Sequence, residues 1–393
     1  MNTPTEELRS RLERYSGFLA QDPDNAGLAN EVAGTHLRLG HFAEAREVLK
    51  ASLTRHPLDP ALLSTLASVA MASGTPLEAI DILQGLIQSG HDHPVNRYNL
   101  AYALLYARRF AEARDVLLPV VDNPQVPEAP LLLARCLHHL GELDEAIRRL
   151  TDFAAHHPQH GEAQGVLALL HLDAMHSEQA RAAAELAIKA NPDDLPAQVT
   201  LGTLALETQD DKASTEYFEH ALKRHPQSGR AWSGLALATM LKLDLPKAIE
   251  QLKTAVQHMP GHIGTWHSLA WCQLLTDDLE GAKQSFEQSM EIDRSFGESH
   301  GGLAVVAVLQ GRLDDAEQSI KRALRLDSNS FAGRFAQSLI LNKTDPAKAQ
   351  ALLKQMLSNP VVAGGESLQT ILQRAIRQRQ TGRNAPPHGP TRH

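Results

Sequence analysis

The chain has 393 residues, of which 42% are hydrophobic and 4% aromatic, and its formal net charge is −8 at pH 7. A modest negative charge spread along the chain excludes a body built to bind nucleic acid, which requires clustered Lys and Arg. Residues 1–25 contain no long apolar run. We therefore expect a cytoplasmic protein, with neither a secretory signal nor direct membrane insertion.

Two cysteines occur, Cys136 and Cys272, too few and too far apart for a disulfide framework or a paired-cysteine metal site. Their separation is four times the length of the repeat described below, so they occupy the same position in two copies of it. We expect both to be small buried side chains without a redox or nucleophilic role.

The N-terminal segment precedes the repeats. Residues 6–20 match the second half of a repeat alone. Because the terminal units of a repeat array need one polar face, we interpret residues 1–25 as an N-terminal capping half-repeat.

From residue 26 the sequence recurs with a period of about 34 residues. The interval from Pro226 to Pro260 equals the interval from Trp232 to Trp266. A small residue also recurs, at Ala45, Ala79, Ala113, Ala146, Ala180, Ser214, Ala248, Ala282 and Ala316. The interval is one residue short between Ala113 and Ala146, which locates a deletion there.

Each unit contains two apolar-periodic segments of about a dozen residues. The turn between them is often marked by Gly, as at Gly40, Gly74, Gly141 and Gly311. No stretch alternates with the two-residue period of a strand. The pattern predicts an all-α protein in which every unit is a helix, a turn and a second helix, and Pro ends the unit because it has no N–H to donate.

This pattern resembles the tetratricopeptide repeat family. The seventh unit carries the family's Trp, Leu, Ala, Ala and Pro as Trp232, Leu235, Ala248, Ala255 and Pro260. The resemblance covers residues 26–330 as nine units, which start at residues 26, 60, 94, 127, 161, 195, 229, 263 and 297. It implies a right-handed α-solenoid superhelix of stacked hairpins, with a concave groove lined by the first helices.

The C-terminal part departs from the repeat. Residues 331–360 have the pattern of a degenerate tenth hairpin whose second helix begins at Pro346. We expect residues 361–380 to hold a C-terminal capping helix, over 366–379, and residues 381–393 to be a disordered tail.

The resemblance also implies where a partner would bind, because the family contacts its partners through positions 2, 5, 9, 12 and 13 of each unit. Polar and aromatic residues at these positions in the first four units are Asn30, Arg38, Tyr98, Tyr102, Tyr106, Arg135, His138 and His139. Tyr and Arg are enriched at interface hot spots, which favours a partner surface. The alternative is that the tyrosines pack between hairpins, although Leu104 already fills the family's buried Tyr position.

In units five to nine the same positions are apolar. They include Leu172, Val199, Leu237, Met240, Leu241, Trp271, Leu275, Val305 and Val308, with His267 beside them. An exposed strip of this length exceeds what a monomer usually tolerates, so we expect a client helix, a second copy of the chain or its own C-terminal helix to cover it. Tight coiling of the superhelix would hide it instead.

The motifs of catalysis and metal binding are missing from the sequence. It contains no phosphate-binding Gly loop, nucleophile elbow or HExxH motif. His-rich stretches at 91–93 and 156–160 suggest a metal, but His56, His157 and His225 each precede a unit-closing Pro, which makes His a feature of the joint. We expect no enzyme activity, cofactor or metal.

The sequence therefore predicts a protein–protein interaction scaffold, an adaptor or client-specific chaperone that holds a peptide or amphipathic helix in its groove. Two alternatives remain at this point. The chain is either a homo-oligomerising structural module or the regulatory subunit of a separately encoded enzyme.

Overall fold

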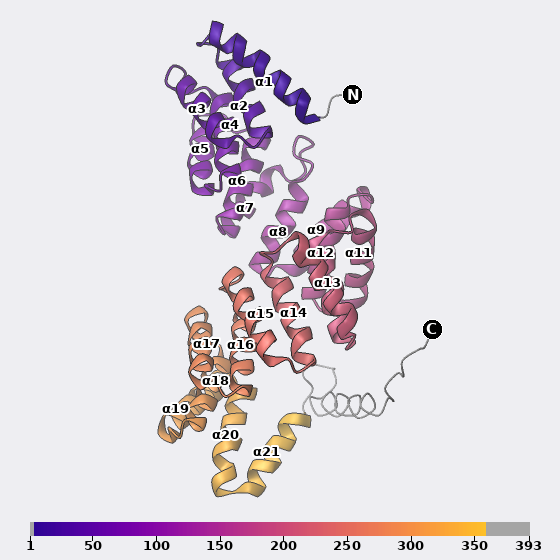
Figure 1. The fold of residues 1–393 in the computed structure, drawn as a ribbon, viewed down its shortest axis with the longest axis vertical. Coiled ribbons are helices and arrows are strands. Elements are labelled where there is room, and N and C mark those ends of the chain that lie inside the picture. Colours follow the sequence, from indigo (N-terminus) through magenta and orange to yellow (C-terminus); the bar gives the residue numbers. More distant parts are fainter. Residues whose placement is uncertain (1–3, 359–393) are drawn as a thin grey trace, which may run out of the picture. The chain divides into compact units, whose positions relative to one another are not determined.

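Every regular element of the computed structural model, which describes residues 4–358, is a helix (Figure 1). The prediction of an all-α helical repeat solenoid is confirmed. The chain divides into two compact units, each of which contains several of the repeats. The first unit ends at Leu201 and the second unit begins at Gly202. Helix α12 (Leu195–Glu207) contains this boundary.

The first unit holds the N-terminal helix and the hairpins that follow it. Its elements are α1 (Pro4–Gln21), α2 (Ala26–Arg38), α3 (Phe42–Leu53), α4 (Pro60–Ala72), α5 (Pro76–Gln88), α6 (Pro94–Tyr106), α7 (Phe110–Leu117), the 3-10 helix η1 (Leu118–Val120), α8 (Ala129–Leu140), α9 (Leu143–His156), α10 (Gly161–Asp173) and α11 (Ser177–Ala190).

The second unit continues the same alternation of first and second helices. It contains α13 (Asp211–Arg224), α14 (Gly229–Leu241), α15 (Leu245–His258), α16 (Ile263–Leu275), α17 (Leu279–Ile292), α18 (Gly297–Leu309), α19 (Leu313–Leu326), α20 (Phe331–Thr344) and α21 (Pro346–Ser358). Pro346 begins α21, as the sequence predicted.

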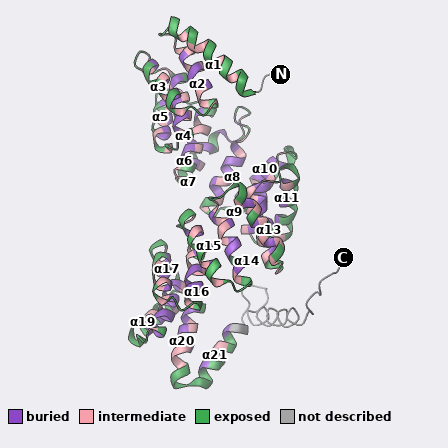
Figure 2. Ribbon diagram, viewed as in Figure 1, coloured by how far each residue is buried: buried purple, intermediate pink, exposed green. Residues whose placement is uncertain are grey.

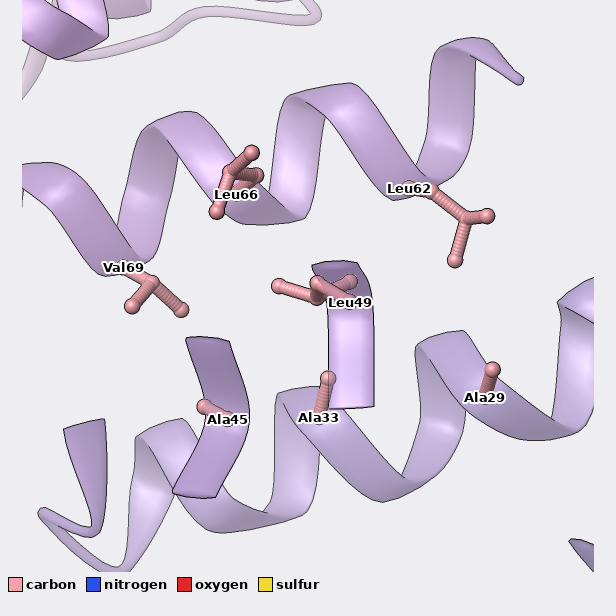
Figure 3. Close-up of a cluster of buried hydrophobic side chains, with 7 residues drawn as sticks. All are labelled: Ala29, Ala33, Ala45, Leu49, Leu62, Leu66 and Val69. Carbon is pink, nitrogen blue, oxygen red and sulfur yellow. The ribbon is translucent and has the colours of Figure 1, made fainter. Parts of the chain in front are cut away.

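Each hairpin is joined to the next through a small apolar core. Figure 3 shows one such core, in which side chains of α2, α3 and α4 point toward one another: Ala29, Ala33, Ala45, Leu49, Leu62, Leu66 and Val69. Ala33 and Ala45 are fully buried, so the first and second helices of one hairpin can approach closely. Leu49 and Leu62 then fill the space between this hairpin and the next.

The recurring small residue is buried in every repeat. Its exposed fraction is 0% at all nine positions from Ala45 to Ala316, including Ser214. By contrast, α1 has no buried residue at all, and Figure 2 shows it in the colours of exposed and intermediate residues. A core position thus repeats through the array, whereas the N-terminal helix keeps a polar outer side.

The turn inside each hairpin ends the first helix with a left-handed residue. Glycine takes this conformation at Gly40, Gly74, Gly141 and Gly311, and non-glycine residues take it at Arg108, Met175, Gln209, Leu243 and Asp277. The turn is therefore the same in all nine repeats, although the sequence marks it with Gly in only four of them.

The one-residue deletion lies in the connector between the third and fourth repeats. Helix α7 is only 8 residues long and continues as η1, which contains Pro119. Because Pro has no N–H to donate, the helix cannot extend regularly through Pro119. The connector from residue 121 to 128 then leads to α8.

The joint between repeats is closed by one hydrogen bond that recurs in five successive repeats. A side-chain N–H at position 4 of the repeat donates to a backbone carbonyl six residues earlier, over 2.7 to 3.1 Å. The pairs are Gln198 with Pro192, Trp232 with Pro226, Trp266 with Pro260, His300 with Arg294, and Arg334 with Ser328. The repeated Trp of the sequence is thus one of four side-chain types that perform the same task.

Two predicted segments lie outside the described residues: the capping helix at 361–380 and the tail at 381–393.

Candidate functional site

A cavity of about 430 Å³ opens in the first unit, between the first helices of successive hairpins. It is lined by Leu37, Ala67, Ser68, Met71, Ala72, Leu83, Asn99, Tyr102 and Tyr106. None of these side chains is charged, so the cavity suits an uncharged group.

The cavity exists because equivalent positions of neighbouring units hold side chains of very different size. Positions 9 and 13 hold Ser68 and Ala72 in α4, and Tyr102 and Tyr106 in α6. The small pair leaves a hollow that the tyrosines border and do not fill. Leu37 and Met71, both at position 12, form the apolar part of the lining.

Tyr102 and Tyr106 act as a pair. The two hydroxyls lie 3.2 Å apart, with Tyr102 donating, and the ring centroids are 4.9 Å apart. Burial, followed by the hydrogen bond to Tyr106, raises the pKa of Tyr102 to about 12. Tyr106 is 59% exposed, so this end of the pair remains open to a ligand. Tyr98 is partly buried on the same helix, and burial raises its pKa too.

Asn30 and Arg38 lie on α2. The Nε of Arg38 donates to the carbonyl of Gly34 over 3.2 Å, and no carboxylate among residues 4–358 pairs with its guanidinium. The Oδ1 of Asn30 is buried and accepts no hydrogen bond from the described part of the chain. Arg38 therefore offers an exposed cation one residue beyond Leu37 of the cavity.

The three predicted residues of α8 are engaged within the protein. Arg135 forms an ion pair with Glu162, and the Nε2 of His138 lies 2.6 Å from an Oδ of Asp173. His139 stacks on Phe110 with ring centroids 4.2 Å apart. These contacts join neighbouring hairpins, so Arg135 and His138 stabilise the stack as well as lining its first helices.

In the second unit, His267 and Trp271 are packed among aromatic rings. His267 lies between Phe286 and Phe296, with both ring centroids 5.2 Å away, and its Nε2 is 3.1 Å from the Oγ of Ser299. Burial lowers the pKa of His267 to about 4.

Trp271 is surrounded in the same way. The rings of Phe286, Phe331 and Phe335 each lie 6.1 Å from it between centroids. Phe331 and Phe335 belong to α20, so the hairpin that follows the ninth repeat partly covers the predicted groove position of Trp271.

The expectation of a continuous exposed apolar wall is wrong in part. Val305 and Val308 are 1% and 6% exposed, and Leu172 and Val199 are also buried, because neighbouring helices cover them. Met240 is half-buried against a core cluster of α14, α15 and α16. Three of the predicted leucines remain exposed at their helices: Leu237, Leu241 and Leu275.

The titratable side chains of the described residues do not assemble a metal site. No group of three or more His, Cys, Asp or Glu side chains gathers as metal ligands within residues 4–358. Cys136 and Cys272 are free and fully buried, and burial raises their pKa to about 12 and about 11, which keeps the thiols protonated. Their predicted burial is confirmed.

Several cavity residues escaped the sequence analysis. Leu37 and Met71 stand at position 12, one of the family's contact positions, and that register was sufficient to find them. Leu83 and Asn99 stand outside those positions, and only the packing of α5 and α6 brings them to the cavity.

Comparison with protein families matches two models, both described as tetratricopeptide repeat. One matches residues 120–170, and the other matches residues 31–94, 199–262 and 269–331. Together they cover more than half of the chain. No helix among residues 4–358 combines the length and the hydropathy that a membrane-spanning segment requires.

One solved structure shares the fold over most of the chain. A monomeric mutant of IFIT1 with Gppp-AAAA matches with a TM-score of 0.51 and 19% identity, over 83% of each chain. YrrB, a TPR protein with an unusual peptide-binding site, matches with a TM-score of 0.40 and 19% identity, over 47% of this chain and 96% of its own. MamA matches with a TM-score of 0.36 and 17% identity, over 40% and 92%.

One curated relative is cellulose synthase 1 operon protein C of Komagataeibacter xylinus. It is 29% identical over 122 residues, which make up 30% of this chain. The match spans only 9% of that protein's own length.

Proposed function

The chain belongs to the tetratricopeptide repeat family, and we propose that it is a non-enzymatic adaptor or client-specific chaperone that holds a segment of a partner protein on its first unit. Repeats of this family generally form protein–protein interaction scaffolds. The finer assignment, a peptide-binding groove, rests on the cavity beside Tyr102 and Tyr106.

The lining of this cavity supports an apolar anchor residue in the partner. Leucine, methionine and alanine side chains of the wall favour burial of an apolar group. The hydroxyls of Tyr102 and Tyr106 and the amide of Asn99 supply the few polar groups that orient a backbone. Tyrosine also gives a large contact area at low entropic cost, which is typical of hot spots.

Arg38 supports an acidic residue next to that anchor. Position 13 of the first three repeats holds Arg38, Ala72 and Tyr106, so the guanidinium stands in the same row as the exposed tyrosine. Because no carboxylate of the described chain neutralises Arg38, a carboxylate of the partner would gain a charge-assisted hydrogen bond there.

Replacing the tyrosine pair tests this function. Partners that copurify with the wild-type chain from its native host are identified, and their affinity is then measured for purified Tyr102→Ala/Tyr106→Ala protein. We expect the affinity to fall by about tenfold or more, because two hot-spot side chains are lost.

Tyr217→Ala is the matched control, since Tyr217 lies on α13 in the second unit and does not line the cavity. This control should bind like the wild type. Unchanged affinity of the double variant, with a circular dichroism spectrum that shows intact helices, would contradict the assignment.

A further inference from the structure

A row of exposed leucines marks the second unit. Leu241, Leu275 and Leu309 are 49%, 66% and 50% exposed, and each is the last residue of its helix, α14, α16 or α18. All three stand at position 13 of three successive repeats. We call them the leucine row. Because equivalent positions of stacked repeats follow one another along the array, we expect these three leucines to form one apolar edge.

The leucine row is not required by the core. Its side chains lie at helix ends, and the core clusters of α14 to α20 are built from other residues. Position 13 in the first unit holds Arg38, Ala72, Tyr106, His139 and Asp173, so the fold accepts polar side chains there. An apolar edge that packing does not demand indicates contact with a partner.

Carboxylates border the leucine row. Asp244, Asp277, Asp278, Glu280 and Asp314 follow the three leucines in the turns and first helical turns, and none has a cation within ion-pair distance among residues 4–358. The neighbouring cations Lys242 and Arg312 are paired with Asp211 and Asp315. Lys247 is an unpaired cation in the seventh repeat, so the acidic excess centres on the eighth.

We propose that the leucine row binds a basic amphipathic helix of a partner protein, whose apolar side chains pack on Leu241, Leu275 and Leu309 while Lys or Arg side chains reach the bordering carboxylates. The charge of the border selects the basic partner. A helix suits a row of equivalent side chains, because its positions i and i+7 recur on one face about 10.5 Å apart.

The leucine row and the cavity of the first unit are built from different residues, so this inference does not rest on the proposed function. Tyr102→Ala/Tyr106→Ala should leave binding at the leucine row unchanged. The leucine variants below should equally leave binding at the tyrosine cavity unchanged.

Fluorescence anisotropy with a labelled Leu–Lys peptide tests the proposal on the full chain. The peptide has about 18 residues, with leucines at i, i+3, i+4 and i+7, and a second peptide has the same composition in scrambled order. We expect the amphipathic peptide to bind at least about tenfold more tightly than the scrambled one. Leu275→Gln/Leu309→Gln should remove that preference. Equal binding of both peptides would overturn the proposal.

Two matched controls separate this surface from general stickiness. Leu326→Gln changes an exposed leucine at the end of α19, outside the row, and should bind like the wild type. Asp277→Asn/Glu280→Gln should weaken binding and reduce its salt dependence, whereas Glu219→Gln on α13 should do neither. If Leu275→Gln/Leu309→Gln instead splits a dimer in analytical ultracentrifugation, a second copy occupies the row and the proposal is wrong.

Discussion

The two units are built from the same helix pair, yet they differ in the residues that close the first helix. Position 13 holds Arg38, Ala72, Tyr106, His139 and Asp173 in the first unit, all polar or aromatic except Ala72, and it is leucine in three repeats of the second. The buried small residue of the second helix, by contrast, is Ala or Ser throughout. Packing fixes the core position, whereas the end of the first helix accepts side chains of different size and polarity, so the residue there can differ with the partner.

The units also differ in how local hydrogen bonds support their hairpins. Asp210, Asp244 and Asp278 begin second helices of the second unit, and each accepts a hydrogen bond from the backbone N–H three residues later. No side chain does this for α3, α5, α7, α9 or α11 of the first unit. The second unit thus has stronger local signals for helix formation.

The largest expected effect is the response of the second unit's stability to acid, because burial lowers the pKa of His267 further than that of His36 or His171 in the first unit. Burial holds the pKa of His267 at about 4, below its ordinary value of 6.5, so the folded protein binds fewer protons than the unfolded one between these values. Stability therefore falls as pH drops from about 6.5 toward 4, by up to about 3 kcal/mol from this group. Tryptophan fluorescence reports the effect, since all three tryptophans follow residue 201.

His267→Gln is the control for this pH dependence. Glutamine does not titrate, so the loss between pH 6.5 and 4 should shrink in the variant when both proteins are unfolded with urea. The same loss in wild type and variant would show that other groups cause it.

A smaller effect is expected where the second unit pairs a large side chain with a glycine. Phe218 is fully buried, and a Cβ added to Gly234 would stand 2.1 Å from its ring. Gly234→Ala should therefore lower the free energy of unfolding by about 1–3 kcal/mol, measured by urea denaturation. At the position of Phe218, the first unit has smaller leucines such as Leu49 and Leu83.

A compensating change distinguishes the clash from a general loss of stability. Phe218→Leu in the Gly234→Ala background should recover part of the lost free energy, because it restores the leucine found in the first unit. Additive losses in the double variant would refute the steric explanation.

The smallest effect concerns the helix caps. Asp278→Ala removes the hydrogen bond to the N–H of Gly281 and should cost about 1 kcal/mol. His41→Asp should stabilise the first unit by a similar or smaller amount, since His41 has backbone angles of −87° and 68°, close to those of Asp244 at −83° and 69°. Thermal unfolding followed by circular dichroism measures both changes; a lower melting temperature for His41→Asp would contradict the explanation.

The helices, the hairpins and the buried small residue could be predicted from the sequence because they recur with a fixed period. Ala113 and Ala282 are buried in different repeats for the same reason, namely the close approach of two helices. The turns were only half predictable. Arg108 and Leu243 take the left-handed conformation where the sequence shows no Gly, because the helices on either side dictate the turn.

The candidate site was predictable at the level of helix faces and no further. Position numbers assigned Tyr102 and Tyr106 to one helix face, beside which the structure has a cavity, but they also assigned Trp271 to an open groove. Phe331 and Phe335 partly cover Trp271, and no periodic signal links α16 to α20. Whether a face is open depends on contacts beyond the neighbouring repeat.

The sequence by itself determined the period, the helix pairs and the residues of each core, since these follow from interactions within one repeat and with its direct neighbour. Only the tertiary structure decided which contact positions reach solvent. It buried Val305 and Val308, enclosed His267 between aromatic rings and left Leu275 and Tyr106 exposed. The physical reason is that exposure depends on the small rotation between stacked hairpins, which adds up over several repeats and leaves no mark in any one of them.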